Sequence, residues 1–377
     1  MKAIYIVSDN IISPVGNTSA ENFASLKKGI SGIRLQADGR LSPEPVYASL
    51  ISEVSGHKRD SSLTKFEDLL VRSVSDALQG SAIKPGDPNT VLILSSTKGN
   101  ISLIEPSGKS AGTDERVSLV HSARLLARHF DFINEPVIVS HACISGLVAL
   151  ITGMRLLQSG KYEHAVVCGA DLITRFILSG FQSFQAISQE PCKPFDAARN
   201  GITLGEGAAT IVLSVKPPAG ADKMQITGGS VSNDANHISG PSRTGEELCQ
   251  AILEALEEAG ISAPEIDFIS AHGTATLYND EMESRAINLA SMGHVPLNSL
   301  KGYYGHTLGA AGLIETVISL QSLRENVVLP TPGFRNAGTS QPVNVLRESR
   351  SGAIKNCLKT ASGFGGCNAA IVIQKTN

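Results

Sequence analysis

Short apolar runs and longer amphipathic stretches alternate along the chain. The apolar runs have the length of buried strands, and the amphipathic stretches repeat their hydrophobic positions with the period of a helix. Such alternation is typical of an α/β fold, in which layers of helices cover buried strands. We predict strands at residues 3–7, 91–94, 136–139, 165–168, 209–213, 225–226, 266–269, 295–300, 353–358 and 369–373. We predict helices at residues 66–78, 118–130, 145–159, 244–259 and 309–326.

The order of these elements in the first part of the chain recurs in the second part. A strand, a turn and a glycine-rich apolar helix at residues 136–159 recur at residues 295–326. A break that contains two prolines and a glycine separates the parts at residues 216–220. We therefore predict a duplicated α/β unit with halves at residues 1–217 and 222–377, and chemistry in loops that follow strands.

The composition of the 377 residues excludes several classes of protein. With 42% hydrophobic and 18% charged residues, the chain is globular rather than disordered. Its net charge of −3 gives no general basic field for nucleic acid. The chain lacks a run of about 18 uncharged apolar residues, so we expect no membrane span.

The cysteines and the N-terminus indicate a cellular compartment. Six cysteines occur without a Cys-x-x-Cys pair, so we expect neither a zinc ribbon nor another metal site. The N-terminal apolar run is too short for a signal peptide. We therefore expect a cytoplasmic protein with reduced thiols, and we ask whether one of them is a nucleophile.

Cys143 is the first candidate for a nucleophile. It lies in a turn between a predicted buried strand and an almost wholly apolar helix. At a helix N-terminus, the macrodipole and free N–H groups lower the pKa of a thiol and can hold an oxyanion. The arrangement resembles a nucleophile elbow, in which Gly146 would let the helix pack closely on the strand. The alternative is a buried cysteine with a structural role.

Two histidines follow predicted strands in the second half of the chain. His272 is surrounded by small residues and hydroxyls, and Asp280 and Glu283 follow it at helical spacing. Taken alone, this stretch also fits a loop histidine on the surface. His306 lies between a strand and an apolar helix, in a run of small residues that permits close approach of the backbone.

Charged residues and a glycine loop complete the candidate set. Lys301 precedes His306 by one turn of loop, and it either holds a charge or is a solvated loop lysine. Glu315 is the only charged residue in the apolar run 313–320. It is either a buried carboxylate with a partner or part of an exposed stripe. Phe364 stands among three glycines at residues 363–366, which indicates a bent loop with available N–H groups, or a hairpin turn.

Another dense cluster of charged and glycine residues lies in the middle of the chain. It combines Asp196 and Arg199 with Glu206, which is flanked by two glycines. We interpret this cluster as a structural network of ion pairs rather than as part of a catalytic site.

Together and in order, these motifs resemble those of the β-ketoacyl-acyl-carrier-protein synthases, condensing enzymes that use one cysteine and two histidines. The resemblance runs nearly end to end, and it implies a thiolase-like fold with duplicated α/β halves in a layered αβαβα arrangement. The matching segments are residues 10–33, 142–146, 193–199, 205–208, 272–283, 301–312 and 363–369.

The resemblance implies a 3-oxoacyl-[acyl-carrier-protein] synthase, an acyltransferase of fatty acid or related polyene or polyketide biosynthesis. It would condense malonyl carrier protein with an acyl group held on Cys143, as carbon dioxide leaves. His272 and His306 would stabilise the enolate, and the N–H groups of Cys143 and Phe364 would hold the thioester oxyanion.

The remaining roles also come from the resemblance. Lys301 would orient the site, Glu315 would anchor Lys301, and Asp280 and Glu283 would support the first histidine motif. Phe364 would gate the site, and Thr274 and Thr276 would hydrogen-bond the pantetheine arm. No cofactor is expected, because the substrates arrive on the phosphopantetheine of acyl carrier protein. A homodimer is expected, with a heterodimer containing a paralogous subunit as the alternative.

The chain also departs from the family pattern. Ile144 replaces a smaller residue after the nucleophile, and Lys193, Asn200 and Cys367 stand where Arg, Asp and Thr are usual. The chain is shorter than most members, with the missing residues around 33–65 and 97–120, which in the family help to line the acyl pocket and the dimer edge. These departures leave the length of the acyl chain and the pathway open.

Two other functions fit parts of the sequence. A non-catalytic chain-length partner subunit would have lost the nucleophile, whereas Cys143, both histidines and Lys301 are present. A thiolase-type enzyme acting on acyl-coenzyme A would need a second catalytic cysteine, and Cys367 lies in a suitable place. The motif at His306, however, is typical of decarboxylating condensing enzymes.

Overall fold

The strands form two units with the same internal order in the computed structural model, which describes residues 2–52, 60–105, 115–218, 223–237 and 240–376. The first unit contains β1 (Tyr5–Ile12), β4 (Thr90–Ser95), β5 (Val137–Val139), β6 (His164–Asp171) and β8 (Gly207–Ser214). The second contains β9 (Lys223–Asn233), β10 (Phe268–Ser270), β11 (Pro296–Asn298), β15 (Asn356–Gly363) and β16 (Cys367–Thr376).

The order and direction of the strands repeat from one unit to the other. The first unit has the order β5-β4-β6-β8-β1, and the second has the order β11-β10-β15-β16-β9. In each unit the first three strands run parallel to one another. Each of the last two strands runs antiparallel to the strand before it in this order. This shared topology confirms the duplicated α/β fold.

The two units meet at an antiparallel contact between β1 and β9. Tyr5 lies opposite Gln225 and Ile6 opposite Met224, so the hydrogen bonds continue from one unit into the other. Short strands add to this framework. These are β13 (Asn344–Val345) at one edge, a separate sheet of β2 (Arg34–Gln36), β3 (Val46–Ser49) and β7 (Leu204–Gly205), and the pair β12 (Val327–Val328) and β14 (Arg350–Ser351).

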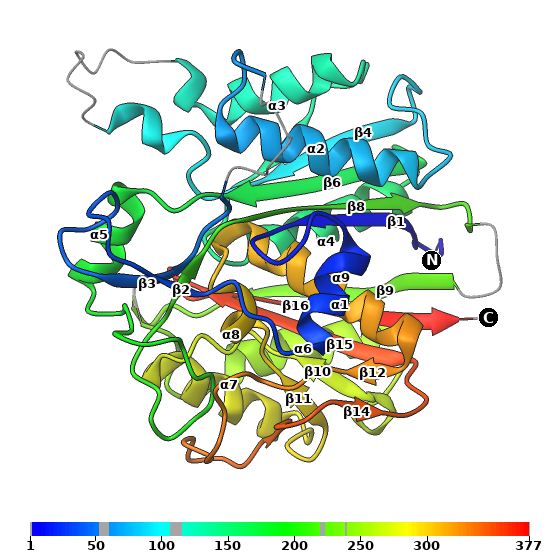
Figure 1. The fold of residues 1–377 in the computed structure, drawn as a ribbon. Coiled ribbons are helices and arrows are strands. Elements are labelled where there is room, and N and C mark those ends of the chain that lie inside the picture. Colours follow the sequence, from blue (N-terminus) through cyan, green and yellow to red (C-terminus); the bar gives the residue numbers. More distant parts are fainter. Residues whose placement is uncertain (1, 53–59, 106–114, 219–222, 238–239, 377) are drawn as a thin grey trace.

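Helices form three layers around and between the strands (Figure 1). The outer layers are α2 (Lys65–Gln79) with α3 (Leu119–His129), and α6 (Glu246–Ala259) with α7 (Leu277–Leu289). The central layer consists of α4 (Ser145–Gln158) and α9 (Ala311–Glu325), which contact strands of both units. The predicted αβαβα layering is therefore confirmed.

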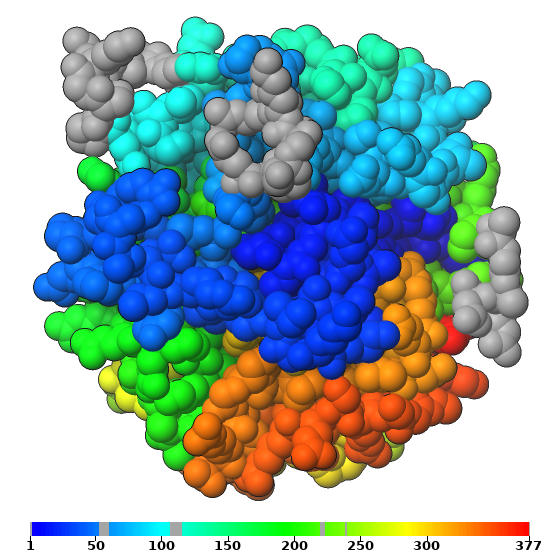
Figure 2. All heavy atoms as spheres, in the orientation of Figure 1, coloured from blue at the N-terminus to red at the C-terminus, as the bar shows by residue number. Residues whose placement is uncertain are grey.

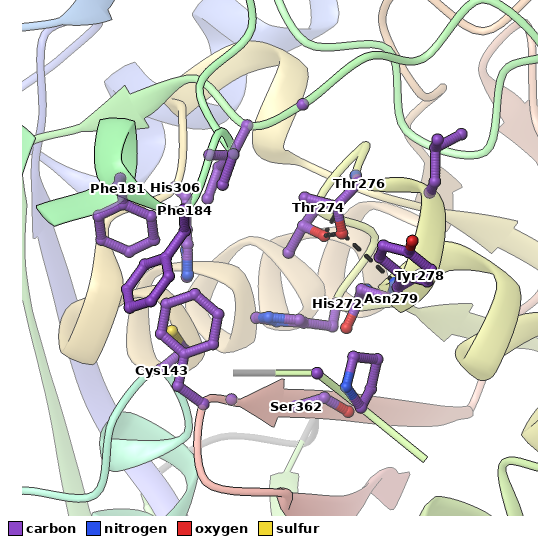
Figure 3. A pocket seen from close by; sticks show the side chains of 18 of the residues that line it. Cys143, Phe181, Phe184, His272, Thr274, Thr276, Tyr278, Asn279, His306 and Ser362 are labelled. Atoms are coloured by element: carbon purple, nitrogen blue, oxygen red, sulfur yellow. Dashed lines mark hydrogen bonds between the residues drawn. The ribbon is translucent and has the colours of Figure 1, made fainter. Parts of the chain in front are cut away.

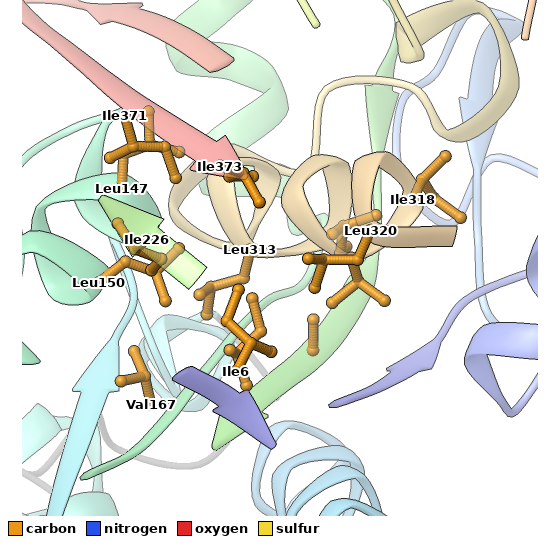
Figure 4. Close-up of a cluster of buried hydrophobic side chains, with 14 of the residues drawn as sticks. Ile6, Leu147, Leu150, Val167, Ile226, Leu313, Ile318, Leu320, Ile371 and Ile373 are labelled. Atoms are coloured by element: carbon orange, nitrogen blue, oxygen red, sulfur yellow. The ribbon is translucent and has the colours of Figure 1, made fainter. Parts of the chain in front are cut away.

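The core lies where the central helices contact the strands of both units (Figure 4). Leu147 and Leu150 of α4 pack in one cluster with Leu313 of α9, Val167 of β6 and Ile371 of β16. Burying each such side chain contributes about 1.5–3 kcal/mol to folding. Because α4 and α9 are covered on both sides, most of their residues are buried, and α4 is apolar nearly all round, as its sequence indicated.

Most predicted strands and helices are present, with shifted ends. The strand predicted at 353–358 occupies Asn356–Gly363, and the chain after β11 turns at once into α8 (Lys301–Tyr304). The predicted helix at 309–326 begins with a 3₁₀ turn, η4 (Leu308–Ala310), before α9.

Several elements were not predicted. They are α1 (Ser19–Lys27), α5 (Arg175–Ser183), α7, α8, the short strands, and the 3₁₀ helices η1 (Ile101–Ile104), η2 (Glu115–Val117) and η3 (Ala263–Glu265). The missed α7 has a physical explanation, because its buried face contains Asp280 and Glu283 and so shows no apolar period. Buried polar contacts hold this helix in place together with the apolar side chains Met282, Ala286 and Ile287.

Some of the sequence interpretations fall partly on residues that are not described. The break at 216–220 and the boundary between the predicted halves include residues 219–222, and the shortened regions include 53–59 and 106–114; all of these lie outside the described residues. Among the described helices, none combines the length and the apolar character needed to cross a membrane.

The first and last parts of the chain pack together at the surface. Helix α1 lies against α9, and Lys27 Nζ is 2.5 Å from Glu325 Oε2. Figure 2 shows this N-terminal segment beside residues of the second half. The two halves therefore hold each other through helices as well as through the sheet.

Candidate active site

Cys143 sits in a strained turn between β5 and α4. The preceding residue, Ala142, has a positive φ of 46°, a conformation that costs a non-glycine residue about 1–3 kcal/mol. The Ser145 hydroxyl stabilises this turn, because it accepts from the His141 N–H at 2.8 Å and donates to the Ala142 carbonyl at 2.6 Å. The predicted strand–turn–helix arrangement around the candidate nucleophile is confirmed.

Gly146 permits a close contact, but with a helix rather than with a strand as predicted. A Cβ atom at Gly146 would lie 2.8 Å from the Leu313 nitrogen and 3.0 Å from the Gly309 oxygen. A Cβ atom at Gly312 would lie 2.7 Å from the Leu147 nitrogen. The central helices thus cross at two glycines, which brings the turn of Cys143 next to the loop that follows His306.

Burial dominates the electrostatics of the Cys143 thiol. It raises the pKa of Cys143 to about 12, and Cys367 adds to the increase, whereas Lys301 and the backbone N–H of Phe364 lower this pKa. The expectation of a lowered pKa at the helix N-terminus is therefore wrong, because desolvation of the charged form outweighs these favourable groups. The Cys143 side chain is therefore a protonated thiol at pH 7.

His272 and His306 lie face to edge in the same pocket as Cys143. Their ring centroids are 5.3 Å apart, with an angle of 84° between the ring planes. Burial, together with the charges of Lys301 and Lys359, lowers the pKa of both histidines well below the ordinary value of 6.5. Both imidazoles are therefore neutral at pH 7. The burial of the His272 side chain contradicts the surface-loop alternative for this residue.

His306 has no internal partner for its ring. Neither Nδ1 nor Nε2 has a hydrogen-bond partner among the described residues, although the side chain is buried. Unsatisfied buried nitrogen atoms are costly, so such a ring usually has a ligand or water as its partner. The backbone of His306 is held in place, because its N–H donates to the Thr203 carbonyl at 2.7 Å.

Lys301 and Glu315 form a buried ion pair behind the histidines. Lys301 Nζ lies 2.7 Å from Glu315 Oε1 and 3.3 Å from His272 Nδ1. Glu315 is thus a buried, paired carboxylate, and Lys301 is not a solvated loop lysine. A contact between the lysine and Nδ1 leaves the Nε2–H of His272 as the donor toward the pocket.

Lys359 is a further site residue, and the sequence reasoning missed it. Its Nζ lies 2.7 Å from Glu315 Oε2, so two buried lysines share one carboxylate. A lysine directly after the apolar run of a predicted strand was the signal that could have identified it, because lysine is almost never fully buried without a partner.

Asp280 and Glu283 organise the backbone of the His272 loop. Glu283 accepts the N–H groups of His272 at 2.8 Å and Gly273 at 2.7 Å. Asp280 accepts those of Thr274 at 2.9 Å and Phe195 at 2.7 Å, and burial raises the pKa of Asp280 to about 6.

The pocket opens between the two halves and has a volume of about 440 Å³ (Figure 3). Thr274 and Thr276 line it, with their hydroxyl oxygens 2.9 Å apart. The lining residues with a predicted role are Cys143, His272, His306, Thr274, Thr276 and Phe364, whereas Lys301, Glu315, Asp280 and Glu283 lie behind this layer.

Phe364 belongs to an aromatic cluster at the pocket. Its ring lies 5.6 Å from that of Phe181 and 5.4 Å from that of Phe184, centroid to centroid. The following residues, Gly365 and Gly366, both have positive φ, so the loop bends as its glycines indicated. The sequence reasoning did not identify Phe181 and Phe184, because nothing in α5 marks them as neighbours of a distant glycine loop.

Two departures from the family pattern lie away from the pocket lining. The Ile144 side chain is fully buried in the core cluster. Cys367 is also buried, with Sγ 3.3 Å from the Phe364 carbonyl oxygen, and does not line the pocket. Cys367 is nevertheless close enough to Cys143 to contribute to the raised pKa of that thiol.

The cluster of Asp196, Arg199 and Glu206 is structural, as predicted. Asp196 accepts the backbone N–H groups of Arg335 and Asn336 at 2.6 and 2.8 Å. Arg199 donates to the carbonyls of Asp196 and Gly338, and Glu206 pairs with Lys65 at 2.5 Å. These bonds tie loops to the sheet.

A duplicated sheet, a cysteine before one central helix and two histidines from the other half define a protein of the thiolase-like class. Residues 1–219 match the beta-ketoacyl synthase N-terminal domain, and residues 224–335 match the beta-ketoacyl synthase C-terminal domain. The chain belongs to the beta-ketoacyl synthase family.

Curated relatives carry names from the same family. The chain is 33% identical over 250 residues to "3-oxoacyl-[acyl-carrier-protein] synthase 2" of Rhizobium meliloti (strain 1021), a match that covers 62% of this chain and 59% of the relative. It is 25% identical over 411 residues to the protein of that name from Coxiella burnetii (strain RSA 493 / Nine Mile phase I), with 99% of both chains covered.

Solved structures share the fold over its whole length. The ketosynthase ApeO of Xenorhabdus doucetiae, solved in complex with its chain length factor ApeC, has a TM-score of 0.87 and 28% identity, covering 99% of this chain and 98% of that chain. A beta-ketoacyl synthase from Burkholderia phymatum STM815 has a TM-score of 0.89 with full coverage of both chains, and at 24% identity it supports the fold alone.

Proposed function

We propose that the chain is a 3-oxoacyl-[acyl-carrier-protein] synthase, which condenses malonyl carrier protein with an acyl group on Cys143 and releases carbon dioxide. The observation that carries this proposal is that Cys143, His272 and His306 line one pocket. Membership of the beta-ketoacyl synthase family supports it, as do the names of the relatives.

In the first step, Sγ of Cys143 attacks the carbonyl carbon of an acyl thioester on the carrier protein. A new C–S bond forms, the bond to the phosphopantetheine sulfur breaks, and that sulfur leaves with the proton of the thiol. The backbone N–H of Phe364, which lowers the pKa of this thiol, and the N–H of Cys143 would hold the oxyanion.

In the second step, the thioester carbonyl of malonyl carrier protein accepts hydrogen bonds from the rings of His272 and His306. The bond to the malonyl carboxylate breaks, carbon dioxide leaves, and the electron pair becomes an enolate. The enolate carbon attacks the acyl carbonyl, and Cys143 leaves as the thiolate, which takes up one proton from water. Neutral rings suit this role, since they polarise the carbonyl and stabilise the charge only as it develops.

The groups behind the pocket keep the site in this state. Lys301 places positive charge behind His272, and Glu315 fixes Lys301. Asp280 and Glu283 hold the His272 loop. We assign to Thr274 and Thr276 the hydrogen bonds to the pantetheine arm, because their hydroxyls line the pocket.

The partner that delivers the substrates is then an acyl carrier protein, which also serves fatty acid, polyene or polyketide synthesis. We infer a dimer, either of two identical chains or with a paralogous subunit. ApeO was solved with a chain length factor, which supports the second form. All six cysteines are unpaired, which supports a reducing compartment such as the cytoplasm.

The role of Cys143 is tested by intact-protein mass spectrometry after incubation with a series of acyl carrier protein thioesters. Wild-type protein should gain the mass of one acyl group, and Cys143→Ala should gain none. Cys168→Ala is a matched control, because Cys168 is buried in β6 and away from the pocket. An acyl adduct at full yield in Cys143→Ala would refute the assignment.

The role of His272 is tested by measuring the two steps separately. His272→Ala should slow the release of carbon dioxide from malonyl carrier protein far more than it slows the acylation of Cys143. Equal loss of both steps would contradict a separate role for this ring. The variant is compared with wild type for thermal unfolding, since the His272 loop is buried.

A further inference from the structure

Lys359 is a fully buried lysine on β15, on the far side of Glu315 from Lys301. Its ammonium group donates to the carbonyl oxygens of Thr360 at 2.6 Å and Ser270 at 3.1 Å, and it pairs with Glu315 Oε2 at 2.7 Å. Ser270 is the last residue of β10, directly before the His272 loop. Lys359 therefore contacts both the loop that carries one histidine and the carboxylate that holds Lys301.

The two lysines divide the carboxylate of Glu315 between them. Oε1 pairs with Lys301 and Oε2 pairs with Lys359, each at 2.7 Å. If Oε2 had no partner, Lys301 would be drawn toward a position between both oxygens, because it has the only other positive charge on this carboxylate among the described residues. Occupation of Oε2 leaves Lys301 on the side of Glu315 that faces His272, at 3.3 Å from Nδ1.

The neighbour of Lys359 supports the same loop. The Thr360 hydroxyl donates to Glu283 Oε1 at 2.7 Å, and that oxygen accepts the backbone N–H of His272 at 2.8 Å. Strand β15 thus holds the His272 loop through two consecutive residues, one acting on the carbonyl groups of the loop and one on its N–H groups.

We propose that Lys359 is a positioning residue of the condensation site, which directs Lys301 toward His272 and adds a second positive charge behind both imidazoles. The proposal rests on the roles given above to His272 and His306. It extends them, because the state of the two rings would depend on a residue that touches neither substrate.

The charges around the rings give the direction of the effect. Lys301 on α8 and Lys359 on β15 oppose a positive charge on either imidazole, and both contribute to lowering the pKa of both histidines. His306 adds to this effect on His272. Negative charge on Glu315 of α9, or on Glu283 and Asp280 of α7, would favour the protonated rings, and the Cys143 thiol is neutral. Removing the charge of Lys359 should therefore raise the imidazole pKa, and removing that of Glu315 should lower it.

The test compares Lys359→Met, Lys359→Arg and Glu315→Gln with wild type. The pKa of each ring is read by NMR titration of protein labelled with ¹⁵N in its histidine rings, which does not depend on activity. Lys359→Met should raise the imidazole pKa by about one pH unit, as expected for loss of a neighbouring like charge. Lys359→Arg should restore the wild-type value, and Glu315→Gln should shift it downward. Lys355→Met is the matched control, because Lys355 is an exposed lysine four positions earlier.

Decarboxylation of malonyl carrier protein gives a second measurement. The acid side of its pH profile should move upward in Lys359→Met and stay in place in Lys355→Met. A purely structural role would lower the melting temperature and reduce activity equally at every pH. The proposal would be overturned if the imidazole pKa values were unchanged in Lys359→Met. If Lys359→Met does not fold, the absence of a downward pKa shift in Glu315→Gln would overturn it instead. Absence of decarboxylation by wild type would refute the proposed function and leave the NMR result to decide the role of Lys359.

Discussion

The two halves of the molecule use equivalent loops for different purposes. In the first half, Asp171 at the end of β6 accepts hydrogen bonds from Ser96 and Thr97, which follow β4, and from Gly309 of the second half. The equivalent places in the second half are the loop after β10, which carries His272, and the end of β15, followed by Phe364; both of these residues face the pocket. One copy of the repeat has structural polar contacts where the other has groups free for a ligand.

The loops that lead into the central helices differ in another way. The loop after β5 carries Cys143, and the equivalent loop after β11 carries Lys301 and His306. Because α4 and α9 cross at Gly146 and Gly312, these two loops lie side by side. Duplication followed by divergence can therefore place the proposed nucleophile and two histidines in one pocket while the scaffold stays the same.

The largest expected effect is a loss of decarboxylation when His306, in the second half, is replaced. His306→Ala removes a buried ring whose nitrogens have no partner among the described residues, so the folded protein loses packing contacts but no hydrogen bond of the ring. It should reduce decarboxylation by about 10²–10³-fold, the usual cost of losing one donor to a developing oxyanion. Steady-state release of carbon dioxide measures this change. A loss below tenfold would mean that His306 does not contact the reacting carbonyl.

A second prediction compares one buried aspartate from each half of the molecule. Asp171 and Asp280 both accept backbone N–H groups of loops, and burial raises the pKa of both. The folded pKa of Asp280, about 6, exceeds its ordinary value of 3.8. The folded state therefore binds more protons between these values, so the stability contributed by protonated Asp280 is present below pH 4 and decreases as pH rises to about 6.

This decrease should amount to about 2–3 kcal/mol in the free energy of unfolding. Urea unfolding of wild type and Asp280→Asn between pH 4 and pH 7 measures it, and the variant should lack this part of the slope. Asp171→Asn should retain it. The same slope in wild type and in Asp280→Asn would show that the carboxyl of Asp280 keeps an ordinary pKa.

The smallest expected effect concerns the place where helices α4 and α9 of the two halves cross. Gly146→Ala would place a Cβ atom 2.8 Å from a backbone nitrogen of α9, so the helices must separate, at a cost of about 1–3 kcal/mol in the free energy of unfolding. Gly153→Ala in the same helix is the matched control, because the contact at 3.1 Å is with a Leu213 side chain that can move.

Urea unfolding measures the stability of both variants, and acylation of Cys143 reports the position of the turn. We expect acylation to slow in Gly146→Ala and to stay close to wild type in Gly153→Ala. Similar losses in the two variants would mean that the crossing does not set the position of Cys143.

Much of the fold and of the pocket could be predicted from local patterns. The alternation of apolar runs and amphipathic helices predicted the duplicated α/β layers, because buried strands need apolar side chains on both faces. The loops after strands pointed to Cys143, His272, His306 and Phe364, which all line the pocket. Local sequence was less informative for α7, whose buried face is polar, and for the direction of helix packing at Gly146.

The sequence by itself determined the repeated order of elements, the strand–turn–helix setting of Cys143, and the set of polar residues available for chemistry. Only the tertiary structure decided the protonation states of Cys143, His272 and His306. Burial raises the pKa of Cys143 and lowers those of the two histidines, because removing water penalises the charged form whatever the local sequence. The partnership of Lys359 with Glu315 and Lys301 also belongs to the tertiary structure, since these residues come from three elements of the second half, α8, α9 and β15, that meet only when that half folds.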